Sequence, residues 1–527
     1  MSDDLDVCHY SIEHLRDIIS KSSSCNTVEK ISNKTHDNYL QSYLNDQGVK
    51  TLIVEQDYID HDYLEDYASY YVRCFSEEYK RKCTRIHFFK NDFSKKEFLE
   101  CLTSFNENKE FHNNLKENYL GFTVIKPLPL SIIGRTCLAT YPEIDGRTFP
   151  VIREYKVNIC GIELSVKSLA FQEQDSTVAA CATSALWSLF QGTGKKFQHK
   201  ILSPIEITKA ATDKLPYNTR TLPNDGLSFE MIAQGIRHVG LEPFAIMVDE
   251  FWLKANLYAY LRGKIPVLLG IRLYDIDPPK PESMGLHAIA VTGFKLNTHN
   301  DSQKYEGKMN LRSSRIDKIY AHDDQVGPFA RMDFDDPIEV NGVNKAQPTL
   351  TTSWKNTRKK ENVVRAVPLM ITIPLYEKIR IPFNSIYLKT KNLNDFLNYI
   401  FVDDVIVDGV FTDKLQIEWD IYLTTNNEYK SALYESDING EYFKEILLSN
   451  MPRYLWCSTA YIEGEKIFDL LFDATDVKNG SCFIIAVSYN NDSFNDICEI
   501  CKEPDTIKIA KDFGVDYIAN WFKNNKI

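Results

Sequence analysis

The alternation of hydrophobic and polar positions divides the chain into three stretches of helices and strands. The first 50 residues are polar and predict loosely ordered helix and linker. Aromatic residues over 58–88 recur at helical intervals and predict a helix that leads into a strand at 84–89. Residues 119–127 predict a further strand. We therefore expect an amino-terminal α/β domain over residues 1–150.

The carboxy-terminal part shows a similar mixture of patterns. A polar stretch over 341–362 precedes a strand predicted at 366–376. Beyond residue 380, strand-like runs alternate with helix-like ones; the strands are predicted at 400–410, 415–423 and 483–489, and the helices at 442–448 and 507–522. We expect an α+β domain over 380–527, and we assign the α+β class to the chain as a whole.

Composition and charge narrow the class of protein. Of the 527 residues, 43% are hydrophobic and 25% are charged, which is typical of globular chains and argues against a fully disordered one. The formal net charge of −12 argues against general binding to nucleic acid or acidic membranes, because phosphate contacts require clustered cations. Abundant Asn, Lys and Ile are typical of AT-rich bacterial genomes.

Targeting and cysteine patterns predict a cytoplasmic protein. The acidic start carries no secretory signal, and no apolar run approaches the 18 or so residues that span a bilayer. The 12 cysteines are scattered, which favours a reducing compartment over a disulfide framework. Cys498 and Cys501 form a C-x-x-C without a second ligand pair, so we predict no zinc site there, and nothing implies an organic cofactor.

The middle region, 151–375, contains a candidate nucleophile. Cys181 opens a dense apolar run of helical spacing, and residues 175–177 (Asp-Ser-Thr) are typical of a helix start. A thiolate at a helix amino terminus is stabilised by the helix dipole. Gln174, or Gln172 two residues earlier, is a candidate amide donor to an oxyanion. Taken alone, however, a Cys in an alanine-rich helix is more often a small core residue.

Two segments downstream offer a base and an acid. A continuous apolar strand is predicted at 265–273, and His287 then opens another strand whose alternate residues are bulky and apolar. A His at the mouth of a buried strand suits a general base, although a surface His is an equally good interpretation. Asp323 and Asp324 end the next predicted strand, 318–321, and an acid there can orient the imidazole. Alternation places Asp323 inward and Asp324 toward solvent, with His322 a further alternative.

This order of segments resembles the papain-like cysteine peptidases, and most closely their bacteriocin-processing branch, over about residues 165–335. The resemblance implies Cys181 as nucleophile, His287 as base and acid, Asp323 as orienting residue and Gln174 as oxyanion donor. The chain departs from the family pattern in its Ala-Cys-Ala sequence and in the seven-residue spacing from Gln174 to the Cys. About 20 polar residues, 297–318, are inserted before the last strand and are candidates for a lid or partner surface.

The resemblance implies a cysteine peptidase that cleaves a protein or peptide substrate through an acyl-enzyme, flanked by two domains that select the substrate or bind a regulatory protein. The same three residues suit isopeptide cleavage, deamidation or acyl transfer equally well. A papain-like scaffold used only for binding is the non-enzymatic alternative.

Overall fold

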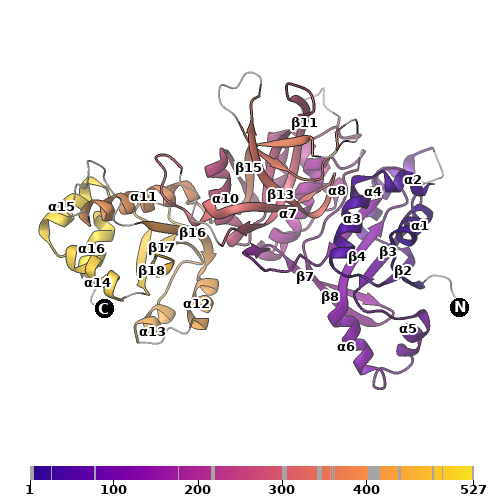
Figure 1. The fold of residues 1–527 in the computed structure, drawn as a ribbon, viewed down its shortest axis with the longest axis horizontal. Helices are drawn as coiled ribbons and strands as arrows, with labels where there is room; N and C mark the ends of the chain where they lie inside the picture. Colours follow the sequence, from indigo (N-terminus) through magenta and orange to yellow (C-terminus); the bar gives the residue numbers. More distant parts are fainter. Residues whose placement is uncertain are drawn as a thin grey trace. The chain divides into compact units, whose positions relative to one another are not determined.

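The computed structural model describes residues 5–24, 27–75, 79–175, 177–214, 220–298, 305–340, 347–356, 358, 360, 362–401, 416–436, 441–477, 480–489 and 491–524 (Figure 1). Helices and antiparallel strands are mixed along the whole chain, which confirms the α+β class. The chain forms two compact units. Unit 1 comprises residues 1–249, 264–295 and 317–375, and unit 2 comprises 250–263, 296–316 and 376–527.

Unit 1 begins with an antiparallel five-stranded sheet in the order β1-β2-β3-β4-β5. Its strands are β1 (Leu5–His9), β2 (Thr51–Tyr58), β3 (Cys83–Phe89), β4 (Tyr119–Ile125) and β5 (Ile133–Leu138). Its helices are α1 (Ile12–Ser22), α2 (Val28–Ser32), α3 (Thr35–Asp46), α4 (His61–Ser69), η1 (Tyr71–Arg73), α5 (Lys95–Cys101) and α6 (Lys109–Asn118). Every pairing in this sheet is antiparallel.

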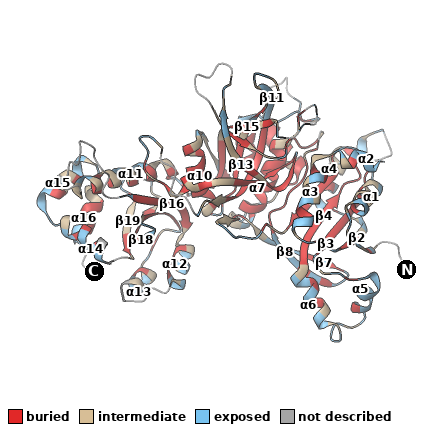
Figure 2. Cartoon of the chain, viewed as in Figure 1, coloured by how far each residue is buried: buried red, intermediate tan, exposed pale blue. Residues whose placement is uncertain are grey.

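Six strands of unit 1 close into an antiparallel barrel. They are β10 (Val267–Asp275), β11 (Glu282–Leu296), β12 (Ile316–Asp323), β13 (Gly327–Ile338), β14 (Gln347–Thr351) and β15 (Val364–Tyr376). The barrel closes because β10 pairs with β15 as well as with β11. The outer strand β9 (Leu241–Met247) adds to β15, and β6 (Arg147–Thr148) pairs with β11. Much of the barrel is buried (Figure 2).

A long buried helix, α7 (Cys181–Phe197), contacts β10 of the barrel. Two amphipathic helices, α8 (Pro204–Thr212) and α9 (Phe229–His238), pack on α7. Ser228 caps α9, since its side chain accepts a hydrogen bond from the backbone N–H of Met231. A separate hairpin, β7 (Arg153–Ile159) and β8 (Ile162–Ser168), precedes α7. The region 1–150 and the barrel thus belong to one compact unit.

Unit 2 is built on the antiparallel sheet β16-β17-β18-β19. Its strands are β16 (Ile417–Thr425), β17 (Tyr454–Ile462), β18 (Glu465–Asp473) and β19 (Phe483–Ser488). Its helices are α10 (Glu250–Arg262), η2 (Arg312–Arg315), α11 (Phe383–Ile400), α12 (Asn426–Glu435), α13 (Glu441–Leu448), α14 (Asn491–Ile500), α15 (Pro504–Asp512) and α16 (Asp516–Asn524). Helix α10 and the inserted residues before β12 therefore belong to this unit.

Most strands of the prediction are present, and the exceptions are local. The predicted helix over 507–522 is two helices, α15 and α16, divided near Gly514, whose φ of 69° favours glycine. The described part of the first 50 residues contains the predicted helix, as α1, α2 and α3, and also the strand β1, which was not predicted. The predicted strand at 400–410 begins at the end of α11, and its remainder, from 402, lies outside the described residues. Among the described helices, none combines the length and apolar character that a bilayer crossing requires.

Candidate functional site

Cys181 is the first residue of α7 and is partly exposed. The residue before it, Ala180, is the N-cap and has no side-chain oxygen, so its side chain does not cap the first-turn N–H groups. Asp175 instead organises the preceding loop, since its carboxylate accepts hydrogen bonds from the backbone N–H of Thr177 and from the Tyr71 hydroxyl. The N-cap thus supplies no side-chain acceptor at the amino terminus of α7, where Cys181 lies.

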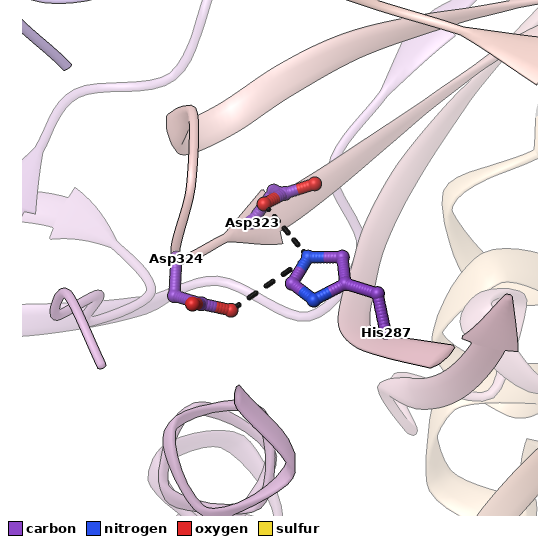
Figure 3. Close-up of side chains that lie close together, drawn as sticks. All are labelled: His287, Asp323 and Asp324. Carbon is purple, nitrogen blue, oxygen red and sulfur yellow. Dashed lines mark hydrogen bonds and ion pairs between the residues drawn. The ribbon is translucent and has the colours of Figure 1, made fainter. Parts of the chain in front are cut away.

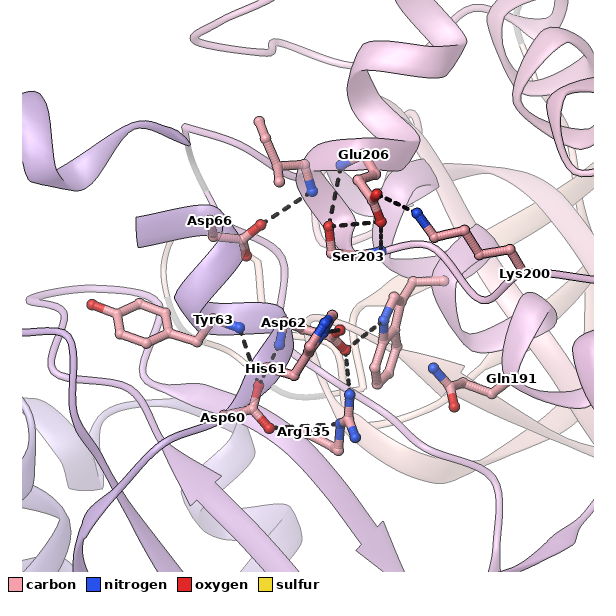
Figure 4. A network of polar contacts seen from close by, with 12 residues as sticks. Asp60, His61, Asp62, Tyr63, Asp66, Arg135, Gln191, Lys200, Ser203 and Glu206 are labelled. Carbon is pink, nitrogen blue, oxygen red and sulfur yellow. Dashed lines mark hydrogen bonds and ion pairs between the residues drawn. The ribbon is translucent and has the colours of Figure 1, made fainter. Parts of the chain in front are cut away.

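A buried polar network fixes α7 in unit 1. Asp62 on α4 accepts a hydrogen bond from Trp187 Nε1 at 3.0 Å and one from Arg135 at 2.6 Å. Trp187 lies six residues after Cys181 and is fully buried. Asp66, one turn further along α4, accepts from the backbone N–H of Ile205 at the start of α8 (Figure 4). Helix α4 therefore anchors both α7, which begins at Cys181, and α8.

His287 lies within β11 and is buried, with 4% of its surface exposed. The prediction that it opens the strand is wrong, because β11 starts at Glu282 and continues the pairing with β10. Its Nε2 lies 3.0 Å from Oδ1 of Asp323. The Cys181 thiol contributes to raising the pKa of the same ring.

Asp323 and Asp324 both face His287 (Figure 3). Oδ1 of Asp324 lies 3.7 Å from His287 Nε2, and both acids are buried. The prediction that Asp324 points to solvent is wrong. The register of β12 against β13 shifts between Ala321 and Asp323, so simple alternation does not hold where the strand ends. Both carboxylates therefore lie beside the same ring nitrogen.

These contacts shift the protonation of all three groups. Burial lowers the pKa of His287, but the charges of Asp323 and Asp324 outweigh burial and raise it well above its ordinary value. Burial raises the pKa of Asp323, yet the His287 charge and hydrogen bonds bring it below its ordinary value. Burial raises the pKa of Asp324 to about 7 despite the attraction of His287. The site favours an imidazolium that faces an ionised Asp323.

His322, the further alternative, is engaged elsewhere. Its Nε2 donates to the backbone oxygen of Leu169 at 2.9 Å, and its Nδ1 accepts from the N–H of Phe329 at 3.0 Å. Burial lowers the pKa of His322 to about 3, so the ring is neutral. We assign it a structural role in the barrel.

The two candidate glutamines differ in environment. An antiparallel bridge pairs Asp175 with Ala179, which brings the next residues of the two arms, Gln174 and Ala180, to adjacent positions beside Cys181. Gln174 is partly exposed. Gln172 is buried, and its Nε2 is without a hydrogen-bond partner in the part of the chain that the structure describes. The strand bridge favours Gln174, because it places this residue opposite Ala180. Gln172 is favoured by its side-chain amide, whose Nε2 has no partner among the described residues.

Trp354 is a site residue that the sequence reasoning missed. Its Nε1 donates to Oδ2 of Asp323 at 2.8 Å, while Oδ1 of Asp323 accepts from the backbone N–H of Gln325 and faces His287. Trp354 is 2% exposed. A Trp in the polar stretch 341–362 was the only available signal, and nothing in the pattern connects it with the acid.

The same cluster is the place to consider a metal ion. His287, Asp323 and Asp324 each offer a ligand atom within 4.8 Å of the others, and among the described residues they form the one such group. However, Nε2 of His287 and both oxygens of Asp323 already have hydrogen-bonding partners within the site. The arrangement fits a hydrogen-bonded acid–imidazole pair better than a ligand set.

No protein-family profile matches the chain, and no curated protein matches it significantly.

Proposed function

We propose that the protein is a thiol hydrolase that cleaves amide bonds through an acyl-enzyme on Cys181. One observation carries the proposal: the buried His287 ring, whose pKa the Cys181 thiol helps to raise, has its Nε2 3.0 Å from Oδ1 of Asp323. These residues come from a helix start, a mid-strand position and a strand end that are far apart in sequence. We also propose that α7 and the six-stranded barrel form a papain-like core.

In the proposed mechanism, a thiolate at Cys181 is paired with the His287 imidazolium. The sulfur attacks the substrate carbonyl, and the first-turn N–H groups of α7, with Gln174 or Gln172, stabilise the oxyanion. His287 gives its proton to the leaving amine as the C–N bond breaks. His287 then takes a proton from water, which attacks the thioester and releases the acid. Asp323 keeps the imidazole oriented throughout.

We propose a protein or peptide as the substrate class. The thiol is partly exposed and the imidazole is buried, so the substrate carbonyl must reach the sulfur from its solvent-exposed side. Isopeptide cleavage, deamidation and acyl transfer use the same three groups and differ in leaving group or acceptor. A product analysis by mass spectrometry separates these reactions: hydrolysis adds water, deamidation adds about 1 Da, and acyl transfer joins two molecules.

The chain supplies its own reference thiol for the decisive test. Cys160 is exposed, whereas Cys181 is only partly exposed, so accessibility alone predicts faster alkylation of Cys160. Burial of the sulfur also raises the pKa of Cys160. We expect iodoacetamide at pH 6 to modify Cys181 at least about tenfold faster than Cys160, because thiolate rather than thiol reacts. Peptide mapping by mass spectrometry measures both rates in one sample.

The same experiment distinguishes an enzyme from a binding scaffold. In His287→Ala, the rate at Cys181 should fall to or below that at Cys160, and the Cys160 rate should be unchanged. A wild-type protein in which Cys160 reacts faster than Cys181 would contradict the proposed nucleophile and support the scaffold. Chelation by EDTA should leave both rates unchanged, and an effect confined to Cys181 would indicate a metal at His287 instead.

A further inference from the structure

One face of α3 lies along the β12–β13 hairpin that carries Asp323 and Asp324. His36, Tyr39 and Asp46 lie at helical intervals of three and seven residues along α3, which places them on one side. Each contacts the hairpin of β12 and β13 at a different point. The helix is encoded almost 290 residues before the acids, so these contacts bring together two distant parts of unit 1.

The first contact is made to Asp324 itself. Nε2 of His36 donates a hydrogen bond to the backbone oxygen of Asp324 at 2.7 Å. His36 is 7% exposed, and burial lowers its pKa, so the ring is neutral and can carry a single N–H. That N–H is committed to Asp324. On the other side of the ring, Nδ1 lies 4.0 Å from the carboxylate of Glu173, which Lys34 and the N–H of Ile133 also contact.

The second contact is made by Tyr39 at the other end of the turn. The hydroxyl of Tyr39 donates to the backbone oxygen of Pro328 and is hydrogen-bonded to the hydroxyl of Tyr141. The Tyr39 ring packs directly on Gly327, where a Cβ atom would collide with it. Gly327 has a φ of 153°, so both its conformation and its neighbour require glycine. The turn at 323–327 is thus held at both ends from α3.

We propose that α3 is a positioning element of the candidate catalytic site, in which His36 and Tyr39 hold the turn at 323–327 so that Asp323 and Asp324 face His287. This inference rests on the proposed function. His36 and Tyr39 touch neither the thiol nor the imidazole, so they act through the acids. The amino-terminal region is then part of the active site's support and cannot be removed as an accessory domain without loss of reactivity at Cys181.

A set of substitutions separates positioning from general stability. His36→Leu removes the donor and keeps an apolar side chain, whereas His36→Gln restores an N–H at nearly the same reach. Tyr39→Phe removes a single oxygen. Asp46→Asn is the matched control, because its exposed ion pair with Arg331 joins the same helix and the same hairpin away from the turn. The readouts are the ratio of alkylation rates at Cys181 and Cys160, its pH profile and the thermal midpoint.

We expect His36→Leu to lower the ratio about tenfold and to change its pH profile, because a small displacement of the acid leaves His287 poorly oriented. His36→Gln should recover most of the loss, Tyr39→Phe should lower the ratio about threefold, and Asp46→Asn should match the wild type. A wild-type ratio and pH profile in His36→Leu overturns the inference even if its thermal midpoint falls.

Two further outcomes are decisive. If His36→Leu does not fold, an unchanged ratio in Tyr39→Phe overturns the inference and a lowered one supports it. A wild-type protein without preference for Cys181 overturns the proposed function together with this inference. Preference for Cys181 in the wild type, unaltered in His36→Leu and Tyr39→Phe, refutes the role of α3 alone.

Discussion

Replacing Asp324 by Asn tests the electrostatics of the site without the need for a substrate. Asp324 is buried beside a second carboxylate, Asp323, and one oxygen of Asp324, Oδ2, is without a hydrogen-bond partner among the described residues. Burial raises the pKa of Asp324 from its ordinary value near 4 to about 7. The amide of Asn has nearly the same shape and carries no charge, so the substitution removes only the ionisation.

The direction of the effect on stability follows from proton linkage. Between about pH 4 and pH 7, the folded protein holds a proton on Asp324 that the unfolded chain releases, so the free energy of unfolding falls as pH rises through this window. The full difference in pKa corresponds to at most about 4 kcal/mol. Asp324→Asn should therefore resemble the wild type near pH 4 and exceed it near pH 8 by up to that amount. For a unit of this size, about 4 kcal/mol corresponds to a rise in midpoint of about 5 °C.

Calorimetry at pH 4.5 and pH 8 measures the difference between variant and wild type, in which contributions common to both cancel. Asp333→Asn is the control, since Asp333 is an exposed carboxylate on the same hairpin and its surface ion pair with Lys318 contributes little. In a His287→Ala background, the gain from Asp324→Asn should grow, because the cation that favours the Asp324 carboxylate is gone. A gain independent of pH, or a loss at pH 8, would refute this account of Asp324.

The other predictions concern reactivity. Cys181→Ala should abolish turnover with little loss of stability, because the side chain is small, as activity and calorimetry would show. His287→Ala should be equally damaging, and the double variant no worse, since the residues act as a unit; multiplied losses in turnover would contradict a shared step. Asp323→Asn should reduce turnover less than Asp323→Ala, because an amide oxygen still accepts from imidazole; the reverse ranking would remove Asp323 from the site. Trp354→Phe, which removes the donor to Asp323, should lower turnover several-fold with an altered pH profile, and an unchanged profile would leave Trp354 a packing residue. Asp324→Asn should shift the alkaline limb of the Cys181 profile to lower pH, since loss of a neighbouring carboxylate lowers the pKa of His287.

The parts of the fold that could be predicted were those with strong local signals. The apolar run at 265–273 corresponds to β10, and the helix that follows the Asp-Ser-Thr sequence begins at Cys181. The acid at a strand end is found at Asp323, the last residue of β12. Each of these depends on periodicity or on residue preferences within about ten positions, which the sequence displays directly.

The wrong predictions concern positions whose structure depends on pairing with residues far away in the sequence. His287 lies inside β11 because β10 pairs with the exposed residues 282–286, and these lack a clear alternation. Asp324 is buried because the register of β12 shifts before the turn. The inserted residues before β12 contribute to unit 2, where the backbone of Trp419 on β16 donates to Asn310. Pairing partners of this kind cannot be identified from one sequence.

The support of the site shows the limit of local reasoning most clearly. The polar first 50 residues predict only loosely ordered helix and linker, because the segment of α3 combines Asn, Asp, Gln and Tyr without a clean apolar stripe. Yet this helix buries His36 against the backbone of Asp324, where the polar ring satisfies an oxygen that would otherwise be buried without a partner. A polar residue in such a place is selected by a partner far away in sequence. A polar residue that would indicate solvent exposure in an isolated segment is, in this fold, buried in a contact with the backbone of Asp324.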